Sequence, residues 1–240
     1  MRVKAVIAYD GSKFYGFQKQ TTTSQTVTTQ IELALKSLHI NSSIVGSGRT
    51  DRGVHASNQV IHFDLPPYWS DLDKLRYTLN QKLSYIDFKH ISKVDSNFHA
   101  RFSATKRIYR YIFQTTKVNV FQKDYISYYD DFDEFKLQES LNCFVGVHDF
   151  KFFHKQGSIV HTTKREIYKS YYVKMGKYHY IYFEANGFLR SQVRMMVEAS
   201  MLVSLNKLDV EDLKRQIDTI KQYTTKLAPP QGLYLARIIY

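Results

Sequence analysis

Hydrophobic and polar residues alternate at the start of the chain and then change to a helical spacing. From residue 3 to residue 9 every second position is apolar, which predicts a strand with one buried face. Between residues 27 and 38 the apolar positions lie three and four apart, which predicts a helix. Ser24 and Thr26 precede this helix, and either residue type is a preferred N-cap.

The rest of the first half continues this succession of strands and helices. Leucines at 72, 75 and 79 predict a second helix, for which Ser70 is a candidate N-cap. Runs rich in β-branched and aromatic residues predict strands at 44–45, 59–64 and 88–94. The order is then βαββαβ, which is typical of the ferredoxin-like unit, an antiparallel sheet with helices on one face.

The second half follows the same order without a visible repeat of sequence. Strands are predicted at 106–113, 167–173, 178–185 and 234–239, and helices at 135–144, 189–201 and 210–220. The predicted fold class is therefore α+β, with two ferredoxin-like βαββαβ halves. We assign residues 1–103 to the first half and residues 104–240 to the second.

The composition narrows the class of protein. The chain has 240 residues, of which 43% are hydrophobic, as in globular proteins. No apolar run approaches the roughly 20 residues that a membrane helix needs, and the N-terminus shows no secretion signal. Cys143 is the single cysteine, and no CxxC or HExxH pattern is present, so we expect no metal. These features favour a cytoplasmic protein with no membrane partner.

The charge points to a polyanionic partner. The formal net charge is +12, and the chain carries 19 Tyr and 16 Phe. Positive charge favours contact with phosphates, and aromatic rings stack on unpaired bases. The alternative is a basic protein whose tyrosines fill its core. Composition favours nucleic-acid binding over that alternative.

The segment GSGRTDRGVH places one carboxylate, Asp51, between Arg49 and Arg52 on a loop with three glycines. Glycines allow tight backbone paths and the close approach of a ligand, and neighbouring positive charges favour an ionised carboxylate, which is able to act as a nucleophile. The alternative is an Asp–Arg pair that stiffens a surface turn. The residues alone favour the turn.

Longer segments change this balance. GRTDRGVHASNQVIHFD resembles the active-site segment of the tRNA pseudouridine synthase A family. Five further segments are similar to that family in the same order and at similar spacing, and the resemblance extends over nearly the whole chain. They are YDGSKFYGFQKQ, NFHARFSATKRIYRYIF, GVHDFKFF, ANGFLRSQVRMMV and LAPPQGLYL.

The resemblance implies roles for individual residues. Asp51 matches the catalytic aspartate, the nucleophile of the family, and Arg49 matches an arginine that engages the RNA and holds the target nucleotide out of its stack. Tyr109 matches the tyrosine that contacts the target base, and Arg194 matches a basic residue that pairs with the aspartate. Leu233 matches an apolar residue of the pocket.

The resemblance also implies a fold and an activity. The two halves share one mainly antiparallel sheet, with helices packed on one side and the active-site cleft between the halves. The enzyme is a homodimer that isomerises uridine to pseudouridine at positions 38, 39 and 40 of the tRNA anticodon stem-loop, with no cofactor. The alternatives are a synthase for another RNA and a non-catalytic RNA-binding or RNA-chaperone protein on the same scaffold. The presence of Asp51 and Tyr109 favours catalysis.

Several positions depart from the family pattern. Phe17 stands where the family usually has Trp, and Glu198 stands where it often has Gly. Arg52 replaces a smaller or different residue after the aspartate, and Arg190 and Ser191 replace a commoner pair. For Arg52 two roles remain open, contact with a phosphate and simple exposure to water.

Other candidate residues have a structural alternative. Lys106, Arg107 and Arg110 form either an RNA track beside Tyr109 or a solvated strand face. In FHARF, His99 and Arg101 either position the substrate or complete a turn; we favour the first. The histidines of the second half are expected to be structural, namely His148, His154 and His161.

Overall fold

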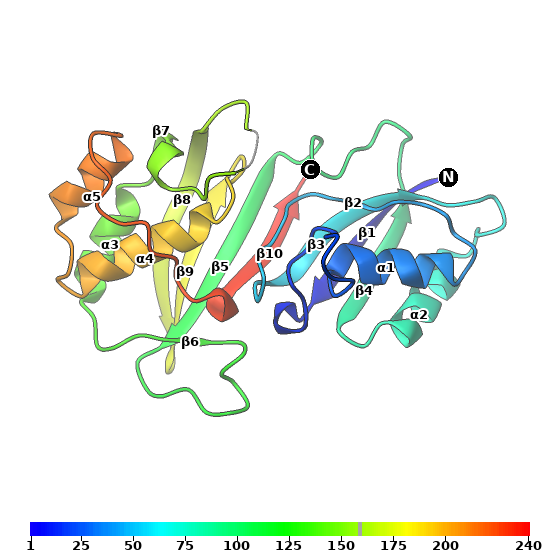
Figure 1. Cartoon of the computed structure of the whole chain (residues 1–240), viewed down its shortest axis with the longest axis horizontal. Coiled ribbons are helices and arrows are strands. Elements are labelled where there is room, and N and C mark those ends of the chain that lie inside the picture. Colours follow the sequence, from blue (N-terminus) through cyan, green and yellow to red (C-terminus); the bar gives the residue numbers. More distant parts are fainter. Residues whose placement is uncertain (158–159) are drawn as a thin grey trace. The chain divides into compact units, whose positions relative to one another are not determined.

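The computed structural model describes residues 1–157 and 160–240. It divides the chain into two compact units (Figure 1). The first unit is Met1–Thr105 together with Tyr234–Tyr240, and the second is Lys106–Leu233. The division falls close to the predicted boundary at residue 103, but the last strand, which we assigned to the second half, belongs to the first unit.

The first unit has the predicted order βαββαβ. Its strands pair in the order β4-β1-β3-β10, with β2 on β3, and every one of these ladders is antiparallel except β3–β10. The elements are β1 (Arg2–Tyr9), α1 (Val27–Lys36), β2 (Val45–Gly46), β3 (His55–Asp64), α2 (Leu72–Lys82), β4 (Ile86–Lys93) and β10 (Leu233–Ile239).

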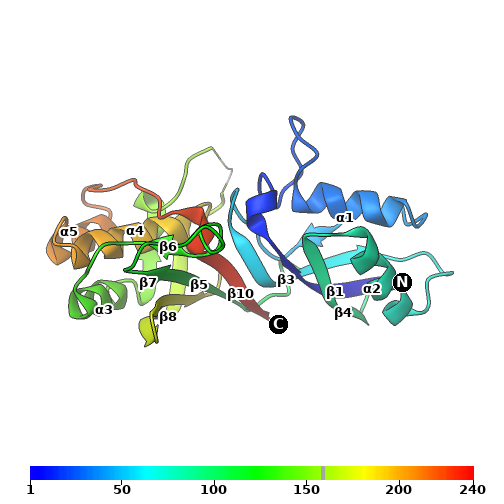
Figure 2. The same ribbon diagram turned by 90° about the horizontal axis from the view of Figure 1, so that it is seen from below.

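Alternation along β1 separates the core of this unit from its surface. Val3, Ala5 and Ile7 are fully buried, whereas the residues between them are partly exposed. Figure 1 shows α1 and α2 over one face of the sheet, and Figure 2 shows α1 set to one side of β1 and β3. The helices bring the apolar stripes that their spacing predicted, including Ile31 and Leu79.

The helix caps confirm one prediction and correct another. The Thr26 side chain accepts the N–H of Thr29 and is the N-cap of α1. Ser70 is not the cap of α2, because the Asp71 carboxylate accepts the N–H of Lys74 at 2.9 Å. Asp is as good a cap as Ser and also complements the positive end of the helix dipole.

The second unit contributes the remaining strands of the structure. Its strands pair antiparallel in the order β5-β9-β8-β7, and β6 runs parallel to β5. The elements are β5 (Lys106–Gln114), β6 (Ser127–Tyr128), α3 (Glu134–Asn142), β7 (Gly146–Asp149), β8 (Lys164–Met175), β9 (Tyr178–Ala185), α4 (Gln192–Ser204) and α5 (Val210–Ile217).

Two differences from the predicted elements have physical causes. Strands β6 and β7 are two and four residues long, too short to display an alternating pattern. The helix predicted to begin at Leu189 begins at Gln192, because Ser191 has a φ of 59° in the left-handed region. The Leu189 N–H instead donates to the Gln192 side chain at 2.8 Å.

The core of the second unit is aromatic. Tyr111, Phe113, Phe144 and Phe183 are fully buried, and the ring of Phe144 meets that of Phe183 nearly edge to face. Mainly antiparallel strands in both units confirm the α+β class. Within residues 1–157 and 160–240, no helix has both the length and the apolar character needed to cross a membrane.

Candidate active site

The loop that carries Asp51 connects β2 to β3 and is held by hydrogen bonds to its main-chain carbonyls. The Gln59 side chain donates to the Gly48 carbonyl at 2.7 Å, and the Val54 N–H closes a turn on the Asp51 carbonyl at 3.1 Å. Gly53 has a φ of 79°, a conformation that favours glycine. Asp51 is partly exposed on this turn. A carboxylate is thus presented at the surface by a loop of defined conformation.

A second set of contacts holds the loop against the N-terminal segment. The Tyr9 hydroxyl and Thr50 Oγ1 are 2.8 Å apart and both residues are buried. The Phe17 N–H donates to the Thr50 carbonyl at 3.1 Å. Any side chain at Gly46 would overlap the ring of Phe17. The close approach that Gly46 allows is therefore to Phe17, the residue that replaces the family's usual Trp.

His55 fixes the end of the loop. Its Nδ1 accepts the Gly11 N–H at 3.0 Å, so this nitrogen carries no proton. The 3.4 Å approach of Asp10 Oδ1 to the same nitrogen is consequently not an ion pair. The ring also stacks on Tyr234 of β10 at 4.6 Å, which links the loop to the last strand.

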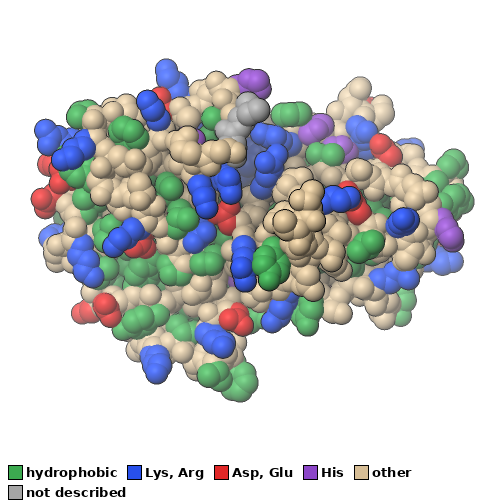
Figure 3. Space-filling model, in the orientation of Figure 1, with side chains coloured by type: hydrophobic (Ala, Val, Ile, Leu, Met, Phe, Trp, Pro, Cys, Tyr) green, Lys and Arg blue, Asp and Glu red, His purple; other side chains and the backbone are tan. Residues whose placement is uncertain are grey.

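Arg49 and Arg52 flank Asp51 on this loop. Arg49 and Arg52 are both exposed, and Figure 3 shows Lys and Arg side chains spread over the visible face of each unit. The Arg52 guanidinium lies 4.3 Å from the centre of the Tyr15 ring, a cation–π contact. Arg52 is therefore not simply exposed to water, because it packs on Tyr15 in the N-terminal segment that also contacts the loop.

Tyr109 lies on β5 of the second unit. Its side chain is buried, and its ring meets Phe188 edge to face at 5.2 Å. Lys106 and Arg110 point to the opposite face of the strand, where Lys106 pairs with Glu184 at 3.1 Å. A single RNA track of all three basic residues beside Tyr109 is therefore wrong, and only Arg107 shares the face of Tyr109.

Arg194 and the segment before β10 hold each other in place. Arg194 Nε donates to the Ala228 carbonyl at 2.7 Å, and the Ala228 N–H donates to the Arg194 carbonyl at 3.1 Å. Leu233, the first residue of β10, follows this segment and is buried. Gly232, just before it, packs on the Tyr111 ring, where a side chain would come within 2.8 Å of that ring.

Glu198 has a structural contact that explains its presence. The Tyr129 hydroxyl donates to Glu198 Oε2 at 3.0 Å. Burial raises the pKa of Tyr129, and the neighbouring Tyr111 and Glu198 raise it further. Glu198 is thus the hydrogen-bond acceptor for the half-buried hydroxyl of Tyr129, an acceptor that glycine at this position would not supply.

Sequence reasoning did not find a hollow of about 390 Å³ at the start of α4. It is lined by positive and polar side chains, among them Lys151, His154 and Lys155, and by the apolar Met195 and Leu227. The basic residues in FKFFHK are its only signal in the sequence. His154, for which we expect a structural role, is buried and hydrogen-bonded to the Lys155 carbonyl at 3.3 Å.

The predicted site residues therefore fall into two groups. Arg49 and Asp51 share one loop of the first unit, and Tyr109, Arg194 and Leu233 belong to the second. The loop supports, Tyr9, Thr50 and Phe17, carry no signal of catalysis and were not predicted to support the site.

Comparison with known proteins gives a consistent result. Residues 5–103 and 141–240 match the family model described as tRNA pseudouridine synthase. The chain is 39% identical to a tRNA pseudouridine synthase A of Campylobacter jejuni, with both chains covered completely. It is 36% identical to that of Wolinella succinogenes, over 98% of this chain and 93% of the relative. For Helicobacter hepaticus the identity is 38%, over 99% and 98%.

Proposed function

The chain belongs to the tRNA pseudouridine synthase A family of isomerases, which form pseudouridine in tRNA, and on this premise we propose that Asp51 is its catalytic nucleophile. The observation that carries the proposal is the presentation of this carboxylate. Asp51 is partly exposed on a turn fixed by hydrogen bonds to main-chain carbonyls, with an arginine on either side. Pre-organisation of this kind lowers the cost of bringing a nucleophile to its target.

The reaction suits a site built from side chains alone. The N1–C1′ bond of uridine breaks, the base turns, and a C5–C1′ bond forms. The proton lost from C5 is balanced by one gained at N1, so substrate and product have the same composition and oxidation state. A nucleophilic carboxylate divides this rearrangement into easier steps, and we propose that no cofactor or metal takes part.

We propose that the target uridines are at positions 38, 39 and 40 of the anticodon stem-loop. A base within a stem must be extruded before it reaches a carboxylate, which costs a few kcal/mol. Arg49 engages the RNA beside Asp51 and helps to hold the extruded nucleotide. The net charge of +12 supports this role, because contacts with phosphates offset the cost of extrusion.

The remaining residues have proposed roles that follow the resemblance to the family. Tyr109 contacts the target base, Arg194 supplies the positive charge that keeps the aspartate ionised, and Leu233 contributes apolar surface. The hydrogen bond that orients the Arg194 guanidinium is compatible with its role, and the burial of Tyr109 and Leu233 is compatible with theirs. We further propose that the enzyme acts as a homodimer in the cytoplasm.

A direct test of the activity uses the purified, dialysed protein and an unmodified tRNA transcript. After incubation, the RNA is digested to nucleosides and pseudouridine is quantified. We expect pseudouridine to form without any added cofactor. Binding of tRNA without formation of pseudouridine would favour the non-catalytic RNA-binding alternative.

Replacing Arg49 with alanine is expected to weaken tRNA binding by about 5-fold or more and to reduce the salt dependence of log Kd by about one. The side chain is exposed, so the melting temperature should not change. Fluorescence anisotropy with labelled tRNA at several salt concentrations measures both effects. Arg76→Ala, which removes a partly exposed arginine from α2 in the same unit, is the control. Equal binding by the two variants would contradict the role of Arg49.

A further inference from the structure

The first unit contains a series of three contacting rings that begins at a buried residue of the sheet and ends at an exposed one. His62 of β3 is buried, and its ring centre lies 5.0 Å from that of His99. The ring of His99 lies 4.4 Å from that of Phe102, tilted by 30°. Phe102 is 75% exposed although it ends this series of contacts. We call His62, His99 and Phe102 the ring series.

The ring series is held by hydrogen bonds to both imidazoles. His62 Nδ1 accepts the Ala100 N–H at 3.1 Å, and His99 Nδ1 accepts the N–H groups of Arg101 and Phe102 at 3.2 and 3.3 Å. A ring nitrogen that accepts a hydrogen bond carries no proton, so His62 is neutral in this arrangement. Burial, followed by the positive charge of Arg2, lowers the pKa of His62 and favours the same state.

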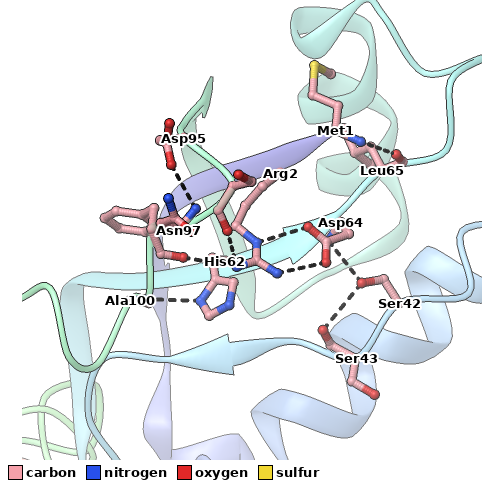
Figure 4. Close-up of polar contacts among 12 residues, drawn as sticks. Met1, Arg2, Ser42, Ser43, His62, Asp64, Leu65, Asp95, Asn97 and Ala100 are labelled. Atoms are coloured by element: carbon pink, nitrogen blue, oxygen red, sulfur yellow. Dashed lines mark hydrogen bonds and ion pairs between the residues drawn. The ribbon is translucent and has the colours of Figure 1, made fainter.

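Hydrogen bonds also hold the segment before Phe102 in place, and Figure 4 shows the polar contacts of this region. Arg2 forms a two-pronged pair with Asp64, with both contacts at 3.0 Å. The same guanidinium donates to the Ser96 carbonyl at 2.6 Å. The Asn97 N–H donates to Asp95 at 2.8 Å. Phe102 is therefore exposed by an ordered segment and not by a loose one.

Positive charge accompanies these rings. The Arg101 guanidinium lies 5.5 Å from the centre of the Phe102 ring, farther than His99 on the same ring. Lys4 Nζ lies 5.6 Å from the ring centre of Tyr240, whose hydroxyl donates to the Ala100 carbonyl at 2.7 Å. The Asp64 carboxylate, which lies in this region, is paired with Arg2. An exposed ring next to a guanidinium suits a base and its phosphate.

The ring series is distant from the catalytic loop along the strand. Asp51 lies just before His55, where β3 begins, whereas His62 lies seven residues further on the same strand. At about 3.3 Å per residue, this separation is about 23 Å. A ligand of the ring series is therefore distinct from the nucleotide on which Asp51 acts.

We propose that Phe102 and His99 form a stacking platform for an unpaired base of the tRNA substrate other than the target uridine, with Arg101 against its phosphate. This inference rests on the proposed function, because it takes tRNA as the partner. Unpaired bases stack on aromatic rings whatever their sequence, and each such contact is worth enough to change the affinity by about 5-fold to 150-fold. RNA is favoured over a protein partner because the exposed aromatic ring of Phe102 lies beside the guanidinium of Arg101.

The test compares Phe102→Ala with the control Phe135→Ala. Phe135 on α3 is 79% exposed, but the residue before it is Glu134, whereas the residue before Phe102 is an arginine. We expect Phe102→Ala to raise the Kd for an unmodified tRNA by about 10-fold, and Phe135→Ala to leave it within about 2-fold. Phe102→Tyr should retain most of the affinity. With saturating tRNA, the single-turnover rate of Phe102→Ala should equal that of the wild type, because the platform binds and does not react.

A spectroscopic readout tests the stack itself. Trp69 is the single tryptophan of the chain, so Phe102→Trp adds one new emitter. We expect tRNA to quench the added emission of Phe102→Trp and not that of Phe135→Trp. Unchanged affinity of Phe102→Ala, no quenching, or a changed oligomeric state that accounts for weaker binding would each overturn the proposal. Because binding is measured directly, these results are independent of whether Asp51 proves to be catalytic.

Discussion

Asp51→Ala is expected to reduce pseudouridine formation by at least about 10⁴-fold, the scale of loss when a nucleophile is removed from an enzyme. The loop should keep its conformation, because the bonds that hold it, from Gln59 to Gly48 and from Val54 to Asp51, use main-chain carbonyls as acceptors. Affinity for tRNA should therefore stay within about 3-fold, since most of it comes from phosphate contacts. Single-turnover assays and equilibrium binding on the same preparation measure both quantities.

Two variants sharpen this prediction. Asp51→Asn keeps the size of the side chain and removes its charge, so it should be as inactive as alanine. Asp73→Asn removes an exposed carboxylate from α2 of the same unit and should be fully active. A rate for Asp51→Ala within about 10-fold of the wild type would be incompatible with a nucleophilic role.

Gly11→Ala is expected to lower the free energy of unfolding by about 3 kcal/mol and to slow catalysis in the protein that remains folded. A side chain at Gly11 would overlap the main-chain carbonyl of Val54 and come within 2.9 Å of the His55 nitrogen. Backbone atoms do not move aside as a flexible side chain does. Relief would displace the start of β3 and break the hydrogen bond from Gly11 to His55, both of which position the Asp51 turn.

Gly176→Ala is the matched control for this substitution. Gly176 has a φ of 59°, but no atom lies within 4 Å of the added carbon. Its cost should be that of the left-handed backbone alone, roughly 1–2 kcal/mol, with no effect on the rate. Urea denaturation gives the free energies. Equal losses at both glycines, or normal activity of Gly11→Ala, would show that close packing at Gly11 does not position the Asp51 loop.

The regular elements were predictable because their periodicity is local. Alternation in β1 and helical spacing in α1 match the buried faces that the structure shows. Caps and short strands were less predictable, since Asp71 competes with Ser70 as a cap and β7 has only four residues. The separation of Lys106 and Arg110 from Tyr109 follows from the two-residue period of a strand, so the pattern itself excluded a single RNA track.

Long-range pairing was not predictable from local pattern. Tyr234 pairs with His55, far away in the sequence, and brings β10 into the first unit. Nothing in the alternation of a strand specifies its partner. The Asp51 loop was selected as a candidate by its similarity to a family. Its supports were not predicted, because the contacts of Phe17 with Gly46 and of Tyr9 with Thr50 depend on tertiary packing.

Chemical mapping of pseudouridine is the most direct test of the central claim. An unmodified tRNA transcript with uridine at positions 38, 39 and 40 is incubated with the wild-type protein or with Asp51→Ala, labelled with a carbodiimide, and read by primer extension. The account predicts stops at these positions with the wild type and none with Asp51→Ala. Modification only at other positions, or equal stops with both proteins, would contradict it.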